Sequence, residues 1–149
     1  MINIVNYLDP RLILFLDNPT RDEALQALVD ALRDANKLQH PDDFLAAILE
    51  REKIVTTGIG MGVAIPHAKL ANYDDFFIAI ALIKEGIQWE SIDHAPVRLV
   101  FMIGGPDDKQ TEYLQILSCL TIAIKDEERR KKLLNAKNPE VIIKLFEGF

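Results

Sequence analysis

Two long apolar runs limit the folds open to this chain. Residues 76–83 and 97–103 are apolar almost throughout, and a shorter run at 12–16 has the same character. Runs of this kind are typical of strands that are buried on both faces. Gly86 is expected to end the first long strand, and the Gly-Gly-Pro sequence at 104–106 is expected to break the second.

Signals for helices separate these runs. Thr20 and Glu23 have the spacing of a capping box, which predicts a helix from there to about Asn36. Pro41 is well placed as the first residue of a second helix, whose far end is charged and lies near Lys53.

The pattern after residue 106 is helical again. We expect a third helix through Ile124, a short charged helix capped by Asp126 that runs to about Ala136, and a last helix that starts at Asn138. The last helix is expected to turn four side chains inward: Val141, Ile142, Leu145 and Phe146. Strands interleaved with helices predict an α/β fold with helices on both faces of the sheet.

The length and net charge of the chain limit the classes of function open to it. A chain of 149 residues fits one domain, here residues 1–149, and its net charge of -6 argues against nucleic acid as a partner. The longest apolar run has 8 residues, whereas a membrane helix needs about 20. The N-terminus has no basic region of the kind that opens a signal peptide. We therefore expect a cytoplasmic protein without membrane insertion.

One histidine stands out in the segment between the second helix and the first long strand. His67 follows a predicted short strand at 63–65, and Pro66 restricts the backbone just before it. This arrangement is expected to hold one imidazole at a strand end. An imidazole there could accept a chemical group, bind a metal or move a proton.

Groups suited to an anion lie close to His67 in the sequence. Gly60 and Gly62 permit positive φ and leave backbone N–H groups unshielded, so they are candidates for binding a phosphate. Thr57 adds a hydroxyl, and Arg51 could donate two parallel hydrogen bonds to an oxyanion. A nucleophilic imidazole beside such donors suits phosphoryl transfer to histidine. These residues alone leave open a histidine that merely caps a turn, or one used in acid–base or metal chemistry.

Other site types are not expected. The three histidines do not pair at the spacing that puts two metal ligands on one helix face, so we expect no metal site. The glycine segment matches neither the dinucleotide pattern nor a P-loop, so we expect no nucleotide cofactor. No serine or cysteine nucleophile motif favours a hydrolase.

Residues 51–53 and 57–70 resemble the active-site block of the IIA domains of the phosphoenolpyruvate-dependent phosphotransferase system. The resemblance is to the fructose/mannitol type, and within it most to the nitrogen-regulatory branch. Residues 87–97 and the helix that begins near Tyr113 are also similar to that family, so the likeness extends over nearly the whole chain from about Ile13 onward.

The resemblance implies a mixed sheet flanked by helices on both faces, and it implies roles for three residues. His67 would be phosphorylated by an HPr-type phosphocarrier protein, and Arg51 would orient the site and balance the phosphate charge. Tyr113 stands where many members of the family have a second histidine. A tyrosine hydroxyl can donate a hydrogen bond to phosphate, but it carries no positive charge.

Three functions remain open on this basis. The first is a regulatory phosphocarrier of the nitrogen type. The second is the IIA component of a sugar-uptake system that passes phosphate to a IIB domain. The third is a regulatory module that binds its partners without phosphorylation.

Overall fold

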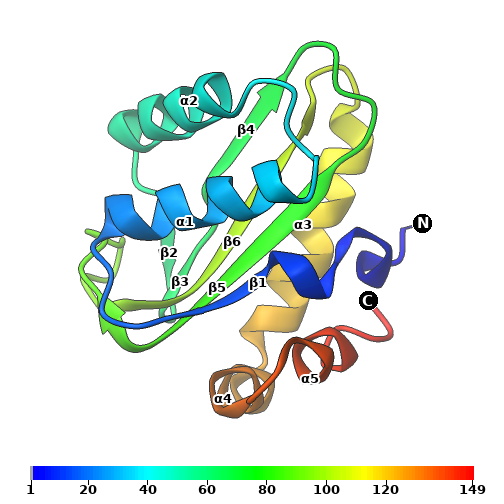
Figure 1. The fold of residues 1–149 in the computed structure, drawn as a ribbon. Helices are drawn as coiled ribbons and strands as arrows, with labels where there is room; N and C mark the ends of the chain where they lie inside the picture. Colours follow the sequence, from blue (N-terminus) through cyan, green and yellow to red (C-terminus); the bar gives the residue numbers. More distant parts are fainter. Residues whose placement is uncertain (1) are drawn as a thin grey trace.

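The computed structural model describes residues 2–149 and places six strands in one sheet (Figure 1). The two long strands form its centre and pair antiparallel with each other. The strands are β1 (Ile13–Leu16), β2 (Gly58–Gly60), β3 (Val63–Ala64), β4 (His67–Leu70), β5 (Phe77–Ile87) and β6 (Val97–Pro106). β1 lies parallel to β5, β3 and β4 both lie parallel to β6, and β2 pairs antiparallel with β3. The mixed sheet that was predicted is therefore confirmed.

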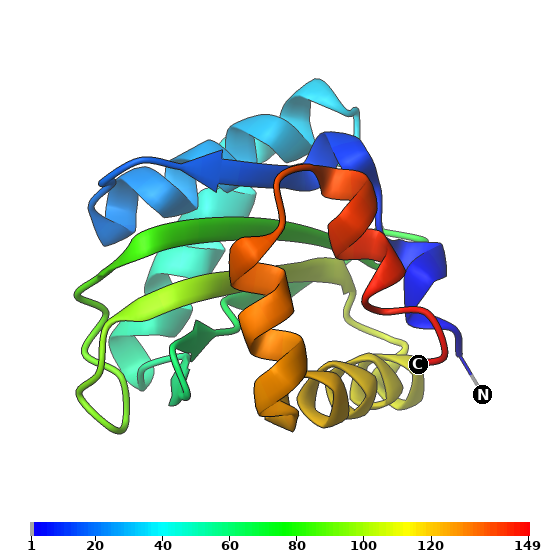
Figure 2. The same ribbon diagram turned by 90° about the horizontal axis from the view of Figure 1, so that it is seen from below.

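Helices cover both faces of the sheet, as predicted (Figures 1 and 2). α1 (Arg21–Asp34) and α2 (Pro41–Ile54) pack on one face, and α3 (Gln110–Lys125), α4 (Glu127–Asn135) and α5 (Pro139–Lys144) pack on the other. Two short 3₁₀ segments, η1 (Ile4–Tyr7) and η2 (Pro10–Leu12), precede β1. The side chains of β5 and β6 alternate between the two resulting cores, because successive residues of a strand point to opposite faces.

Capping hydrogen bonds confirm the predicted starts of three helices, α1, α4 and α5. The Glu23 backbone N–H donates to Thr20 Oγ1 at 3.1 Å, and the Thr20 N–H donates to Glu23 Oε1 at 2.8 Å, which is a complete capping box. The carboxylate of Asp126 accepts from the first turn of α4, and Asn138 Oδ1 accepts from the first turn of α5. Because these contacts span two or three residues, the local sequence is enough to predict them.

The glycines of the central strands do not end them, so two predicted boundaries are wrong. β5 passes through Gly86, which takes a φ of +79° where the register with β6 shifts, and continues to Ile87. β6 continues to Pro106 because β4 pairs with residues 103–106. Gly104 lies against the rings of Phe77 and Phe44, so the absence of a side chain admits close packing here.

Other differences concern short elements. β2 and β4 were not predicted, and β3 ends at Ala64, one residue before the expected end. Val141 was expected to face inward but is 40% exposed, whereas Ile142 and Phe146 are buried. α5 is only 6 residues long and ends at Lys144, so Leu145 and Phe146 lie beyond the helix. None of the helices within residues 2–149 is both long and apolar enough to cross a membrane.

Candidate phosphoryl-acceptor site

His67 is the first residue of β4, at the end of the sheet where α3 begins. The Pro66 carbonyl accepts a hydrogen bond from the Ile103 N–H at 2.9 Å, and His67 itself lies beside Ile103 in the sheet. The backbone on the N-terminal side of the imidazole is thus tied to the central strand. The side chain is half-buried.

The tautomer of His67 follows from one hydrogen bond. Its Nδ1 lies 3.0 Å from the backbone oxygen of Ile65. A carbonyl oxygen can only accept, so Nδ1 must carry the hydrogen, and in the neutral ring Nε2 then holds the lone pair. Nε2 is the ring nitrogen able to act as a nucleophile.

The surroundings of His67 favour the neutral ring. Burial lowers its pKa below the ordinary value of 6.5, and the positive charges of Arg51 and Lys69 lower it further. The hydrogen bond to Ile65 and the charge of Glu52 oppose this shift without reversing it. At neutral pH the imidazole is therefore uncharged and able to accept an electrophile.

This lowered pKa predicts how stability depends on pH. Below pH 6.5 the unfolded chain binds a proton on this ring that the folded chain resists, so the free energy of unfolding falls as the pH decreases through that value. We expect urea unfolding to show a larger loss of stability between about pH 7.5 and about pH 5.5 in the unaltered chain than in His67→Gln. Equal losses in the two proteins would contradict the lowered pKa.

Arg51 and Glu52 bring charge to the site from the last turns of α2. Arg51 donates from one terminal nitrogen to the backbone oxygen of Val55 at 2.7 Å, which anchors the guanidinium and leaves its other N–H groups for a ligand. Glu52 is buried, and its carboxylate accepts hydrogen bonds from the N–H and from the hydroxyl of Thr57. The Thr57 hydroxyl hydrogen is therefore committed to Glu52.

Tyr113 lies beside His67, as the resemblance implies. The two ring centroids are 5.8 Å apart, and Tyr113 is buried on the first turns of α3. Burial raises the pKa of its hydroxyl, partly offset by the charge of Arg51, so the group stays neutral at physiological pH. It can donate a hydrogen bond but supplies no charge.

Lys69 supplies a second positive charge at this position. Its Nζ lies 4.4 Å from the centroid of the Tyr113 ring, a cation–π contact, and donates to Gln110 Oε1 at 2.6 Å. Because alternate residues of a strand share a side, Lys69 and His67 both project from β4 toward Tyr113. Arg51 and Lys69 thus place two cations near the imidazole.

The structure does not bring Gly60 and Gly62 to His67. The Gly62 oxygen accepts from the N–H groups of Arg98 and Leu99, while His67 lies beside Ile103. Positions 99 and 103 are about 13 Å apart along a strand. The Met61 N–H between the two glycines already donates to the Asp93 carboxylate at 3.1 Å. The positive φ of Gly60 and Gly62 shapes the turn between β2 and β3 instead.

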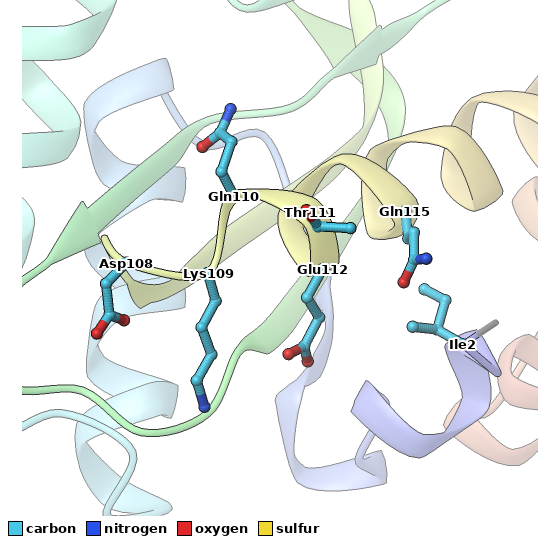
Figure 3. A pocket seen from close by; sticks show the side chains of 7 residues that line it. All are labelled: Ile2, Asp108, Lys109, Gln110, Thr111, Glu112 and Gln115. Carbon is cyan, nitrogen blue, oxygen red and sulfur yellow. The ribbon is translucent and has the colours of Figure 1, made fainter.

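A hollow of about 620 Å³ lies at the start of α3, but its lining does not include His67 (Figure 3). It is bordered by Ile2, residues 108–112 and Gln115. In Figure 3 the side chain of Gln110 extends to the side opposite Lys109 and Glu112. On that side, Gln110 accepts the hydrogen bond from Lys69 Nζ and so connects the start of α3 to β4.

The other two histidines lie on the surface. His40 is the exposed residue before α2, and His94 is exposed in the turn before β6. No three His, Cys, Asp or Glu side chains within residues 2–149 are grouped so as to hold a metal ion.

Two residues of the site were missed from the sequence. Lys69 was missed because β4 was not predicted, and only on a strand that begins at His67 must the second residue after it lie on the same side. Glu52 was missed because a glutamate in a charged helix end is usually solvated, and its burial depends on how the following loop folds back over α2.

The relationship to known proteins agrees with this geometry. Residues 6–148 match the model of the family described as "Phosphoenolpyruvate-dependent sugar phosphotransferase system, EIIA 2". The chain belongs to this family. This EIIA domain is 36% identical over 140 residues to the PTS system fructose-specific EIIA component of Haloferax volcanii, which covers 93% of this chain and 91% of that one.

Relatives of the regulatory kind also match. The domain is 34% identical over 119 residues to a nitrogen regulatory protein of Bradyrhizobium diazoefficiens, with 78% of each chain covered. Among solved structures, nitrogen regulatory protein IIA-Ntr from Neisseria meningitidis superimposes with a TM-score of 0.89, covering 96% of this chain and 98% of that one. Its sequence identity is 24%, so this likeness bears on the fold alone.

Proposed function

We propose that this EIIA domain, taken as a single unit over residues 1–149, is a phosphocarrier in which Nε2 of His67 accepts a phosphoryl group from an HPr-type phosphocarrier protein. The observation that carries the proposal is the hydrogen bond from Nδ1 to the Ile65 oxygen, which leaves Nε2 with a lone pair in a ring kept neutral by its surroundings. Membership of the EIIA family supports the same chemistry.

The proposed phosphoryl transfer has two reacting groups, the imidazole of His67 and the phosphohistidine of the donor. The Nε2 lone pair forms an N–P bond with the incoming phosphorus while the N–P bond of the donor's phosphohistidine breaks, and the hydrogen on Nδ1 stays in place. Exchange between two phosphohistidines is nearly balanced in energy, so the step needs no metal or nucleotide. Catalysis then rests on positioning and on charge stabilisation around a loose transition state.

The residues around Nε2 have distinct roles in this proposal. Arg51 and Lys69 offset the negative charge of the moving phosphoryl group, and the neutral Tyr113 hydroxyl offers it a hydrogen bond. Thr57 acts indirectly, because its hydroxyl already serves Glu52. Gly60 and Gly62 take no part in binding the phosphate, since they lie at the other end of the short strands.

The direct test is to incubate the domain with phosphoenolpyruvate, enzyme I and an HPr-type carrier, and to weigh it by intact-mass spectrometry. We expect a mass increase of one phosphate that is lost on mild acid treatment, as for a phosphohistidine. No mass increase with a carrier pair that phosphorylates another EIIA domain would overturn the proposal and favour a module that acts by binding alone.

Removing the charge of Lys69 tests the second of the two cations that act on His67. Lys69→Met keeps the length of the side chain, and we expect it to slow phosphoryl acceptance by roughly 10- to 100-fold, because one stabilising charge is lost from the transition state. Lys69→Arg keeps the charge and should retain most of the rate. Equal rates for the Met and Arg variants in single-turnover mass measurements would remove Lys69 from the site.

The destination of the phosphate separates regulation from sugar uptake, and we propose regulation. Tyr113 offers the bound phosphate a neutral hydroxyl instead of a second titratable cation, which suits a phosphorylated state that persists as a signal. The fructose-specific relative keeps the uptake role as the alternative. Adding a fructose-specific IIB domain to the phosphorylated protein distinguishes them. Rapid, complete loss of phosphate to IIB would establish uptake, and retention would support regulation.

A further inference from the structure

A buried carboxylate on α2 has no ion-pair partner within residues 2–149. Glu52 is only 7% exposed, and its two oxygens accept from the N–H and the hydroxyl of Thr57. Burying a carboxylate is costly unless hydrogen bonds compensate. Both of these bonds go to one residue, in the loop that leads from α2 to β2. The carboxylate is therefore placed to hold that loop.

Thr57, which donates to Glu52, is bonded in turn to Ile65, and the carbonyl of Ile65 orients His67. The backbone oxygen of Thr57 accepts from the Ile65 N–H at 3.0 Å, and the backbone oxygen of Ile65 accepts from His67 Nδ1, also at 3.0 Å. Ile65 is thus bonded to Thr57 on one side and to the imidazole on the other. Pro66 follows directly, so the chain from Ile65 to His67 has little freedom to adjust.

We propose that Glu52 is a positioning residue that selects the tautomer of His67 through Thr57 and Ile65, so that Nε2 is the reacting nitrogen. Without the carboxylate, the Thr57 loop loses its anchor, and the Ile65 oxygen is positioned only by the pairing of Ala64 and Pro66 with β6. Nδ1 then has a less firmly held acceptor, and a larger share of the neutral rings carries the hydrogen on Nε2. The consequence for phosphoryl transfer rests on the proposed function, but the tautomer itself does not.

Glu52 is suited to this role by its bonding, because its two hydrogen bonds go to Thr57 and neither goes to the imidazole of His67. Its charge still reaches the ring and opposes the lowering of the His67 pKa. Its neighbour Arg51 donates to the Val55 oxygen. Successive residues of a helix do not face each other, so the side chains of Arg51 and Glu52 leave α2 in different directions. Arg51 acts on the phosphate, whereas Glu52 acts on the backbone.

Nitrogen-15 NMR of the unphosphorylated protein near pH 7.5 measures the tautomer directly. We expect His67 of the unaltered chain to show one protonated nitrogen, Nδ1, and one unprotonated nitrogen, Nε2, with widely separated shifts. In Glu52→Ala and in the milder Thr57→Val, which removes only the hydroxyl, the two shifts should move toward each other. Thr57→Ser keeps the hydroxyl and should match the unaltered chain.

An exposed glutamate on the same helix controls for the change of charge. Glu50 pairs with Lys53 at 3.1 Å on the surface, and Glu50→Ala should leave both shifts of His67 in place. An Nε2-protonated ring in the unaltered chain, or unchanged shifts in both Glu52→Ala and Thr57→Val, would overturn the inference. Because no phosphoryl donor is present, these outcomes are independent of whether the protein is a phosphocarrier.

If the domain does accept phosphate, a second measurement follows. Thr57→Val should lower the rate of acceptance by roughly 10- to 100-fold, as for other groups that orient a functional histidine. The dependence of the rate on carrier concentration should be unchanged, because the docking surface is untouched. A shift in that dependence with an unchanged maximal rate would contradict a positioning role.

Discussion

Replacing His67 by glutamine is expected to abolish phosphoryl acceptance while leaving the fold intact. A glutamine amide can still donate to the Ile65 oxygen, but it has no nucleophilic nitrogen to take the place of Nε2. Losing the nucleophile of a covalent step removes nearly all of the rate, so we expect a fall of at least about 1000-fold. Intact-mass measurement with phosphoenolpyruvate, enzyme I and an HPr-type carrier should show no added phosphate.

The chain offers a matched control for this substitution. His40 is exposed before α2 and makes no capping hydrogen bond, so His40→Gln changes the same residue type without touching the site. We expect it to be phosphorylated like the unaltered chain. If His67→Gln still gained a phosphate, or if His40→Gln failed to, the acceptor would have to lie elsewhere.

Replacing Gly104 by alanine should produce a large loss of stability for a single added methyl group. A Cβ at this position would lie 2.5 Å from the Phe77 ring and 2.6 Å from the Phe44 ring, well inside contact distance. Two aromatic rings in a packed core cannot both move aside cheaply. We expect the free energy of unfolding to fall by about 3 kcal/mol, at the upper end of the usual cost of overpacking, as measured by urea denaturation.

A second substitution, Gly148→Ala, serves as a control that separates this steric effect on stability from the general cost of replacing glycine. It has a φ of +93° but nothing within 4 Å of the position of a Cβ. Gly148→Ala should therefore cost only about 1 kcal/mol, from backbone conformation alone. Because Gly104 pairs with Ala68 in the strand that carries His67, Gly104→Ala should also slow phosphoryl acceptance. Equal stability losses at the two glycines would show that the packing around Gly104 adapts.

The predictable parts of the fold are those set by neighbours in the sequence. The capping box at Thr20, the caps at Asp126 and Asn138, and the buried runs of β5 and β6 depend on residues a few positions apart. Such contacts form within one segment, so the order of residue types is enough to predict them. The ends of the long strands were not predictable in the same way, because β4 extends β6 through glycines that ordinarily stop a strand.

The same distinction between local contacts and tertiary contacts applies to the residues around His67. His67 could be singled out from Pro66 and the glycines before it, and Arg51 and Tyr113 from the resemblance to the family. The sequence could not show that Gly60 and Gly62 lie at the far end of the short strands, because that depends on the register of β3 against β6. Nor could it show that the Thr57 hydroxyl is taken by Glu52.

From its sequence alone, then, this chain is an α/β protein with one exceptional histidine, because alternation, capping and proline act on adjacent residues. Which nitrogen of that histidine is free, and which cations lie near it, were decided only by the tertiary structure. Those properties depend on a carbonyl held by a loop and on side chains from α2, β4 and α3, elements that only the packed sheet brings together.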